Sequence, residues 1–155
     1  MGMVVNINEL PREYTDDPDF QTRIKTLLIG DAAGSEKLYV NIDFVKPGSV
    51  STKYHAHSQQ EEFFLIMSGS GILRLNGKEI PVKTGDAVSK PAGKGSAHQF
   101  INNTSEVLQI LDIGTREKDD IVTYPDEGTL YVKNRKLVFH LGDHIEDWVS
   151  EPDQV

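Results

Sequence analysis

The 155-residue chain contains no cysteine. This absence excludes disulfide bonds, thiolate nucleophiles and every zinc or iron–sulfur site that depends on cysteine ligands. The first residues, MGMVVNINELPREY, also lack the basic and apolar regions of a signal peptide. We therefore expect a cytoplasmic protein, in which any metal site is built from nitrogen and oxygen donors.

Basic residues are in the minority. Lysine and arginine number 16 against 24 aspartates and glutamates, for a formal net charge of −8. Nucleic-acid binding needs clustered basic side chains, and a membrane span needs roughly 20 apolar residues in a row. The chain has neither feature, so we expect a small molecule as its ligand, and no nucleic acid or membrane. Its composition, 37% hydrophobic and 26% charged, is that of one ordinary globular domain.

Short apolar runs separated by turn sequences fill the middle of the chain. The runs are KLYVNIDFV, EEFFLIM, GILRL, DAVSK, AHQFI and VLQILDI. Strands at spacings of about 8–12 residues indicate an all-β sandwich or barrel. Asn76-Gly77 predicts a type I′ hairpin turn, because both residues tolerate a positive φ angle. Residues 20–115 contain no sustained helical period of apolar residues.

The two ends of the chain differ from this middle region. Residues 9–20 are polar and interrupted by proline, and residues 116–128 form a charged connector that is followed by two further strand-like runs. We expect an N-terminal arm over residues 1–20, a β-barrel over 21–115 and a C-terminal extension over 116–155. The extension is expected to pack on the barrel or against a partner subunit.

Three histidines and a glutamate are spaced as metal ligands. His55 and His57 share one face of a strand, about 6–7 Å apart. The step to Glu62 allows a turn that returns a carboxylate beside them, and His98 begins a later strand as the natural fourth ligand. Imidazole and carboxylate donors without sulfur suit one divalent transition metal ion, which could be Fe, Mn, Co, Ni, Cu or Zn.

These residues lie in two blocks, GSVSTKYHAHSQQEEFFLIMSG and GDAVSKPAGKGSAHQFIN. Both blocks resemble the signature motifs of the cupin superfamily, G-x5-H-x-H-x3,4-E-x6-G and G-x5-P-x-G-x2-H-x3-N. The sequence departs from them by having six residues between Gly48 and His55 and four between Gly93 and His98. Glu61 also fits the ligand spacing, but the step to Gly69 favours Glu62.

The resemblance implies a double-stranded β-helix, or jelly-roll, barrel that carries the metal at these four residues and commonly forms homodimers. The stretch PAGKGSAHQFIN and the later YPDEG turn resemble a group of small one-barrel cupins, some of which are named as sugar-phosphate isomerases. A metal-dependent enzyme of the dioxygenase, sugar isomerase or epimerase, or decarboxylase type is therefore one expectation. The other is a non-catalytic barrel that binds or senses a small molecule. No residue is predicted to be a general acid or base.

Several residues could line a pocket beside the metal, but each also has a structural explanation. An apolar wall of barrel side chains, or the packed core itself, would account for the aromatic and aliphatic candidates. The basic candidates could bind an anionic substrate or could simply be solvated strand residues. The asparagine is explained by hydrogen bonds within its turn. The candidates are Lys53, Phe64, Ile66, Arg74, Phe100 and Asn102.

Two other features carry less weight. Tyr54 alternates to the face opposite His55, which predicts an outer or interface position. His140 and His144 are spaced for one face of a helix, but Gly142 lies between them and no third ligand converges on them. We therefore do not expect a second metal site there.

Overall fold

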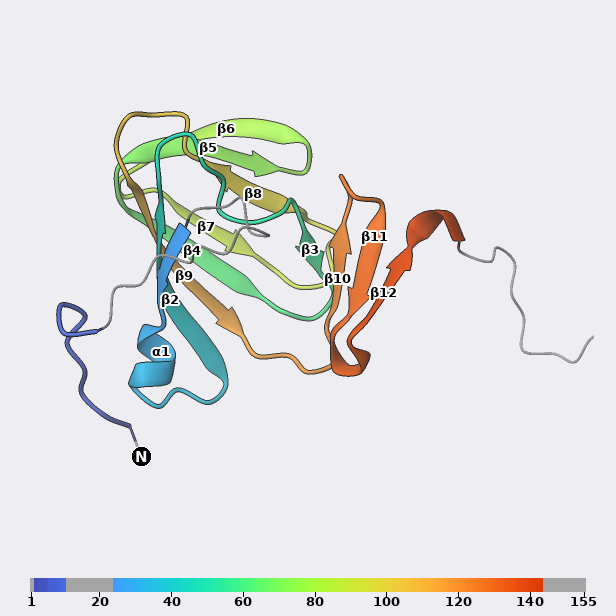
Figure 1. Ribbon diagram of the computed structural model, residues 1–155, viewed down its shortest axis with the longest axis horizontal. Helices are drawn as coiled ribbons and strands as arrows, with labels where there is room; N and C mark the ends of the chain where they lie inside the picture. Colours follow the sequence, from blue (N-terminus) through green and yellow to red (C-terminus); the bar gives the residue numbers. More distant parts are fainter. Residues whose placement is uncertain (1, 11–23, 144–155) are drawn as a thin grey trace, which may run out of the picture.

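The computed structural model describes residues 2–10 and 24–143, and nearly half of them lie in short antiparallel strands (Figure 1). The strands are β1 (Ile24–Leu27), β2 (Leu38–Val45), β3 (Ala56–His57), β4 (Glu62–Ser68), β5 (Ser70–Leu75), β6 (Lys78–Lys83), β7 (Ala87–Lys90), β8 (His98–Ile101), β9 (Leu108–Thr115), β10 (Ile121–Tyr124), β11 (Thr129–Val132) and β12 (Leu137–His140). Helix α1 (Ile29–Ala32) and the 3-10 turns η1 (Lys133–Arg135) and η2 (Leu141–Asp143) are single turns.

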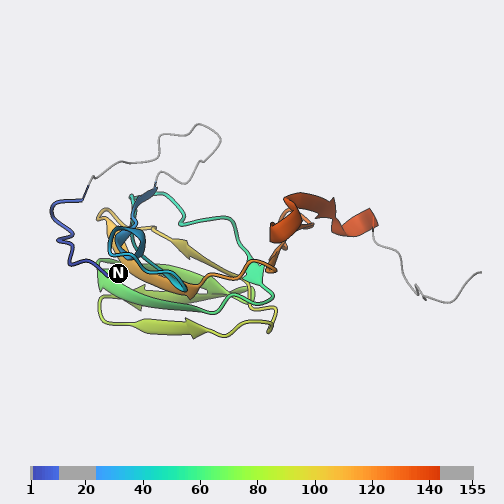
Figure 2. The same cartoon turned by 90° about the horizontal axis from the view of Figure 1, so that it is seen from below.

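Two sheets form the barrel. The larger has the strand order β1-β2-β9-β4-β7, and the smaller has the order β6-β5-β8. Figure 2 shows the barrel strands in stacked layers, with the C-terminal strands projecting from one end. Side chains from both sheets fill the interior, and this core consists of Val45, Phe64, Ile66, Leu73, Val82, Phe100, Leu108 and Ile110. The predicted all-β jelly-roll fold is confirmed.

Strand β4 shows how the alternation of side chains positions a carboxylate inside the barrel. Glu62, Phe64 and Ile66 are buried, whereas Phe63 and Met67 on the opposite face are 42% and 40% exposed. Successive residues of a strand face opposite sides, so the apolar pair Phe64 and Ile66 fixes the direction of Glu62 as well. A charged group is thus held at the end of an apolar wall.

The predicted hairpin turn is confirmed. Asn76 and Gly77 have φ angles of 50° and 74°, and they connect β5 to β6 with Leu75 opposite Lys78. This mirror-image turn matches the twist of the two strands. The hairpin returns β6 along the outer edge of the smaller sheet.

The C-terminal extension joins the barrel through strand pairing. Strand β10 pairs with β3, where Val122 lies opposite His57 and Thr123 opposite Ala56. The complete order of this third sheet is β12-β11-β10-β3. A segment that the sequence places outside the barrel is therefore hydrogen-bonded to the strand that carries His57.

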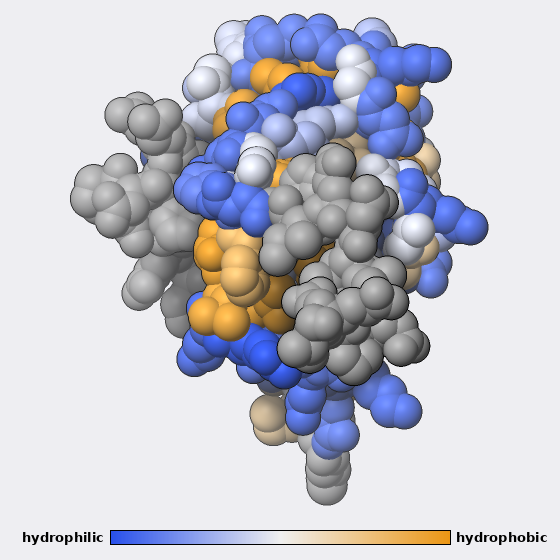
Figure 3. Space-filling view, turned by 90° about the vertical axis from the view of Figure 1, so that its right-hand side faces the viewer, coloured by the Kyte–Doolittle hydropathy of each residue, from blue (hydrophilic) through white to orange (hydrophobic). Residues whose placement is uncertain are grey.

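The far edge of this sheet is apolar and exposed. On and next to β12, Leu137, Val138, Phe139 and Leu141 are 45%, 65%, 50% and 36% exposed. Figure 3 faces this end of the molecule and shows apolar side chains gathered among polar ones. His140 is also exposed, and its predicted neighbour His144 lies outside the described residues.

Residues 11–20 of the predicted N-terminal arm lie outside the described part as well. Of the preceding residues, Met3 donates a backbone hydrogen bond to Ala33 after helix α1 (3.0 Å). Among the described residues, no helix has both the length and the apolar character needed to cross a membrane.

Candidate metal centre

Backbone pairing places His55 directly opposite His98. The amide of His55 donates to the carbonyl of His98 (3.2 Å), and the amide of His98 donates back to the carbonyl of His55 (2.9 Å). The two ring centroids are 4.7 Å apart. Residues so far apart in the sequence meet because a bridge between the two blocks fixes their register.

His57 follows on the same face, as the strand alternation predicts. Its ring centroid lies 4.9 Å from that of His55. Its Nδ1 atom lies 2.5 Å from Oδ2 of Asp120, and its Nε2 atom lies 3.4 Å from Oε1 of Glu62. The ring therefore presents one nitrogen to the C-terminal extension and the other to Glu62 in the barrel interior.

Glu62 lies among several nitrogen-bearing side chains and is 4% exposed. Its Oε1 atom accepts hydrogen bonds from Tyr39 (3.0 Å) and Gln60 (3.2 Å). Its Oε2 atom lies 2.5 Å from the ammonium of Lys90 but accepts no hydrogen bond of good geometry. Glu61, by contrast, is exposed, and its backbone amide donates to the Thr115 hydroxyl (3.2 Å).

Three of the four predicted ligands come within reach of one point. One ligand atom each from His55, Glu62 and His98 lies within 4.8 Å of the others, and all three residues are buried. His57 adjoins this group through Glu62. The cluster is compatible with a metal ion.

Hydrogen bonds hold two of the imidazoles in orientations suited to ligation. Nδ1 of His55 lies 2.7 Å from the carbonyl of Lys53, so this nitrogen carries the proton and donates it. Asp120 accepts from Nδ1 of His57 in the same way. In both rings the lone pair of Nε2 then remains available, because a neutral imidazole has one donor and one acceptor nitrogen.

Burial keeps two of the imidazoles neutral. It lowers the pKa of His55 to about 4, with the charge of Lys90 adding to the effect. Burial also lowers the pKa of His98 well below its usual value, again with a contribution from Lys90. Neutral imidazole is the form that binds metals, so two of the candidate ligands need no deprotonation at neutral pH.

Glu62 is held in its charged form. Burial alone would raise its pKa, but the neighbouring His57 and the positive charge of Lys90 hold the pKa well below the usual range. The buried carboxylate is thus ionised, and its Oε2 atom lacks a well-aligned donor. A buried carboxylate among three imidazoles, of which His55 and His98 are neutral, fits a divalent cation.

A second group of polar residues extends from Glu62 along the barrel wall. Oη of Tyr39 lies 3.0 Å from both Oε1 of Glu62 and Oδ1 of Asp112. A hydroxyl has one proton, so two ionised carboxylates cannot both receive it. Burial, together with Asp43 and Glu62, raises the pKa of Asp112 to about 8, which makes Asp112 the protonated member. The protonated Asp112 can therefore donate a hydrogen bond to Tyr39, and the Tyr39 hydroxyl can donate one to Glu62.

Comparison with known proteins identifies the family. The profile described as "Cupin domain" matches residues 42–114. An oxalate-binding protein from Thermotoga maritima is 34% identical over 115 residues, which cover 71% of this chain and 93% of that protein. The chain belongs to the cupin superfamily.

Two solved cupin structures resemble it over most of their length. One is a candidate sugar phosphate isomerase from Acidithiobacillus ferrooxidans, with a TM-score of 0.76, 30% identity and coverage of 79% of both chains. The other is a sugar phosphate isomerase from Silicibacter pomeroyi, with a TM-score of 0.75, 27% identity and coverage of 83% of this chain and 85% of that one.

The apolar pocket candidates of this cupin lie in or beside its core. Phe64, Ile66 and Phe100 are all at least 96% buried. The Phe64 ring lies 4.8 Å from that of His98 and 5.2 Å from that of Phe100. Phe64 therefore forms the apolar floor under the histidine cluster, and the other two fill the barrel behind it. Asn102 donates to the carbonyls of Val45 (2.8 Å) and Glu106 (2.7 Å), as a turn-stabilising residue does.

The basic pocket candidates do not reach the interior. The Lys53 side chain is 64% exposed and pairs with Glu127 (3.0 Å). Arg74 forms two hydrogen bonds to Asp126 (2.5 and 2.9 Å) and lies over the ring of Tyr54. Tyr54 faces away from the histidines, but it is only 6% exposed and accepts a hydrogen bond from the Gly77 amide (2.7 Å).

Four polar residues of the site lie outside the predicted set: Tyr39, Gln60, Lys90 and Asp120. Lys90 is the buried last residue of β7, just before the proline of the second motif. The alternation of this strand next to the motif is a sequence signal that could have identified it. Asp120 offers none, because it lies in an acidic connector that reads as a solvated loop. It is nevertheless 0% exposed and accepts from the Gln59 amide (2.9 Å).

Proposed function

We propose that this cupin binds one divalent transition metal ion through His55, His57, Glu62 and His98, and uses it to act on a small anionic metabolite. The observation that supports the proposal most strongly is the buried, ionised Glu62 whose Oε2 atom lacks a well-aligned hydrogen-bond donor. Three imidazoles surround it, and two of them have a hydrogen-bonded Nδ1 that leaves Nε2 available.

When bound, the ion would serve as a Lewis acid and as a template for a polar substrate. The chain's own residues provide the remaining parts of the site. Asp120 orients His57, and Phe64 excludes water from one side of the cluster. Asp112 and Tyr39 hold a proton near Glu62 and are the candidates for moving it.

Charge balance supports an anionic ligand. Glu62 and Asp120 are ionised, and the buried Lys90 ammonium lies against Glu62. With Lys90 protonated, a divalent ion would leave the cluster with excess positive charge. In a buried site such an excess favours a ligand that brings a negative oxygen.

Sugar-phosphate isomerisation is the reaction we propose. It is supported by the names of two related solved proteins, and by the Asp112–Tyr39 pair, because isomerisation of an aldose to a ketose moves protons between neighbouring carbons and oxygens. Binding of a small dicarboxylate without turnover is the second candidate, and the oxalate-binding relative favours it. Dioxygenase and decarboxylase chemistry would use the same ion, but no other described side chain singles them out.

Two measurements on the same sample separate these possibilities. Elemental analysis of protein purified without chelator should find about one transition-metal equivalent per chain, and His57→Ala should reduce it strongly. Proton NMR in D₂O should then show deuterium exchange and interconversion of aldose and ketose phosphates with wild-type protein. Binding of oxalate without turnover of any sugar phosphate would favour the second candidate. Less than about a tenth of an equivalent of metal, unchanged by His57→Ala, would contradict the proposal.

We also propose that a second copy of the chain covers strand β12. This edge strand carries the exposed Leu137, Val138 and Phe139, and exposed apolar edges usually pair or are covered. Light scattering should give twice the chain mass for wild type and the single chain mass for Val138→Asp. A wild-type monomer at micromolar concentration would contradict a homodimer. The cytoplasmic location stays a prediction from the sequence.

A further inference from the structure

A cleft of about 620 Å³ opens beside the candidate metal centre. Its lining comes from the start of β2, the turn before β4, the connector after β9 and η1, so the C-terminal extension contributes part of it. The lining includes Tyr39, Gln60, Arg116, Lys118 and Lys133. None of them was predicted as a site residue.

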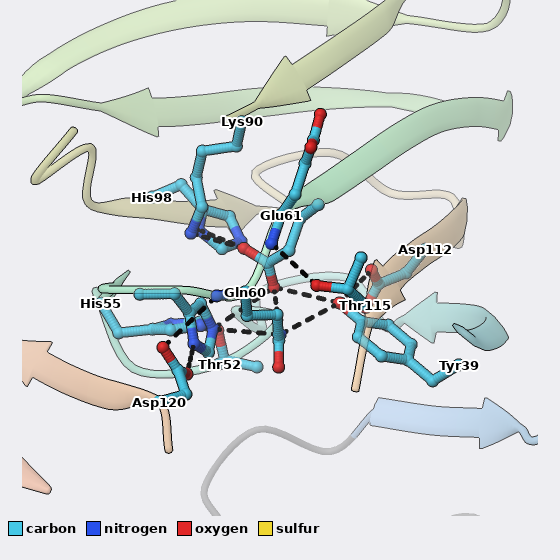
Figure 4. Close-up of polar contacts among 12 residues, drawn as sticks. Tyr39, Thr52, His55, Gln60, Glu61, Lys90, His98, Asp112, Thr115 and Asp120 are labelled. Carbon is cyan, nitrogen blue, oxygen red and sulfur yellow. Dashed lines mark hydrogen bonds and ion pairs between the residues drawn. The ribbon is translucent and has the colours of Figure 1, made fainter. Parts of the chain in front are cut away.

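Two of these residues form the wall between the cleft and the metal centre. Gln60 is only 7% exposed, and its Nε2 atom lies 3.2 Å from Oε1 of Glu62 and 3.3 Å from Nε2 of His57. Tyr39 contacts the same Glu62 oxygen, and Figure 4 shows it beside Gln60. A molecule in the cleft is therefore separated from the proposed ligand atoms by one layer of side chains.

Lys133 contacts this wall from the cleft side. Its ammonium donates to Oε1 of Gln60 at 3.4 Å, which is a long hydrogen bond to a neutral acceptor. Among the residues that the structure describes, neither Lys133 nor Lys118 forms an ion pair, whereas Arg116 is paired with Asp31. Within the described part of the chain, two cations in the cleft thus lack a carboxylate partner.

The cleft is not uniformly basic, because Glu36 and Glu117 also line it. The position of the cations therefore matters more than their number. Lys133 is half-buried, so an anion beside it is less screened than one at the open surface. It also touches Gln60, whose amide adjoins the metal centre.

We propose that the cleft holds the anionic group, a phosphate or a carboxylate, of a small molecule whose other polar end displaces the Gln60 amide to reach the proposed metal ion. Lys133 is the principal anion-binding residue, Lys118 supports it, and the Gln60 amide lies where the two parts of the molecule join. The inference rests on the proposed function and adds the class of substrate, which is a small metabolite with polar groups at both ends.

Calorimetric titration of metal-loaded protein tests the subsite with three probes. Ribose 5-phosphate carries a phosphate, succinate carries a second carboxylate, and ribose carries no charge. Lys133→Gln should weaken binding of at least one anionic probe by about tenfold or more, the usual effect of losing a hydrogen bond to a charged group. Loss confined to ribose 5-phosphate identifies phosphate as the group held, and loss confined to succinate identifies carboxylate.

Lys78→Gln is the matched control, because it removes the same charge from an exposed position on β6. It should change each affinity by less than about twofold. Metal content, measured on the same samples, should be equal in wild type, Lys133→Gln and Lys78→Gln.

The outcomes separate this inference from the proposed function. If the protein holds its metal but Lys133→Gln binds both anionic probes as tightly as wild type does, the cleft is not the anion subsite. The inference would also be overturned if ribose and ribose 5-phosphate bound with equal affinity and Lys133→Gln left the affinity for succinate unchanged. If wild type holds no metal, the proposed function fails. Titration of the metal-free protein with inorganic phosphate then still tests Lys133, and a tenfold loss in Lys133→Gln would support the subsite.

Discussion

Replacing Asp120 by asparagine should weaken metal binding without unfolding the protein. Oδ1 of Asp120 accepts from the Gln59 amide (2.9 Å) and the Ser58 hydroxyl (3.2 Å), and an asparagine carbonyl can retain both contacts. Its Oδ2 atom, 2.5 Å from Nδ1 of His57, would become an NH₂ group. A donor at this point favours the tautomer of His57 that carries its proton on Nε2, the atom that faces Glu62.

The size of the effect follows from the interaction that is lost. A hydrogen bond to a charged group contributes about 1.5–3 kcal/mol. In the variant, metal binding has to move the His57 proton from Nε2 back to Nδ1, and this costs a comparable free energy. We therefore expect Asp120→Asn to reduce metal affinity by about 10- to 100-fold. Titration of chelator-stripped protein with cobalt, in competition with a chromophoric chelator, measures the dissociation constant and reports ligation in the visible spectrum.

The adjacent residue provides the control. Asp119 is exposed, and its Oδ1 atom accepts from Asn134 (2.6 Å), so Asp119→Asn removes the same charge outside the site. It should bind cobalt as wild type does. If folded Asp120→Asn binds cobalt within about threefold of wild type, Asp120 does not orient a metal-binding His57.

Three further predictions follow from the described contacts. Burial raises the pKa of Asp112 to about 8, so its contribution to stability is full below about pH 4, where the unfolded carboxyl is also protonated, and is lost as the pH rises through 8. Urea unfolding of metal-free protein should show wild type losing about 1–3 kcal/mol more than Asp112→Asn between pH 5 and pH 9; parallel pH profiles would refute this. Gly114→Ala should destabilise the protein by about 1–3 kcal/mol in thermal unfolding, because the new methyl group would overlap the Tyr39 ring, while Gly142→Ala meets no neighbour and should be neutral. Lys53→Ala should change stability by less than about 0.5 kcal/mol and leave metal content unchanged, and a loss of metal would show that this exposed ion pair matters to the site.

Local patterns in the sequence predict much of the fold. The step to Gly69 favours Glu62 over Glu61, and β4 does bury Glu62 with Phe64 and Ile66. The alternation in EEFFLIM does not decide this by itself, because Phe63, Leu65 and Met67 on the face of Glu61 are apolar as well. The prediction that His98 joins His55 in one cluster rests on the two motif blocks, and the paired backbones do place the two residues opposite each other.

The same reasoning accounts for the basic residues that face outward. Arg74 follows Leu73, which is 2% exposed, so the alternation of β5 directs Arg74 away from the core and toward Asp126. The strand period therefore contained the information that Arg74 is a surface residue.

Asp120 could not be predicted from local patterns. Its partner His57 is 63 residues away in the sequence, and the two meet because β10 pairs with β3. That pairing joins a two-residue strand to a segment beyond the barrel, and neither has a distinctive hydrophobic period. Lys133 and the cleft depend on the same long-range pairing, since η1 follows β11 in this sheet.

Anomalous diffraction at the absorption edge of the metal found by elemental analysis tests the central claim most directly. We predict one peak, at about 2.0–2.3 Å from ligand atoms of His55, His57, Glu62 and His98, with the Lys90 ammonium outside the coordination sphere. A crystal of protein soaked in excess metal that shows no peak, with the Lys90 ammonium still between Oε2 of Glu62 (2.5 Å) and Nδ1 of His98 (2.7 Å), would contradict it.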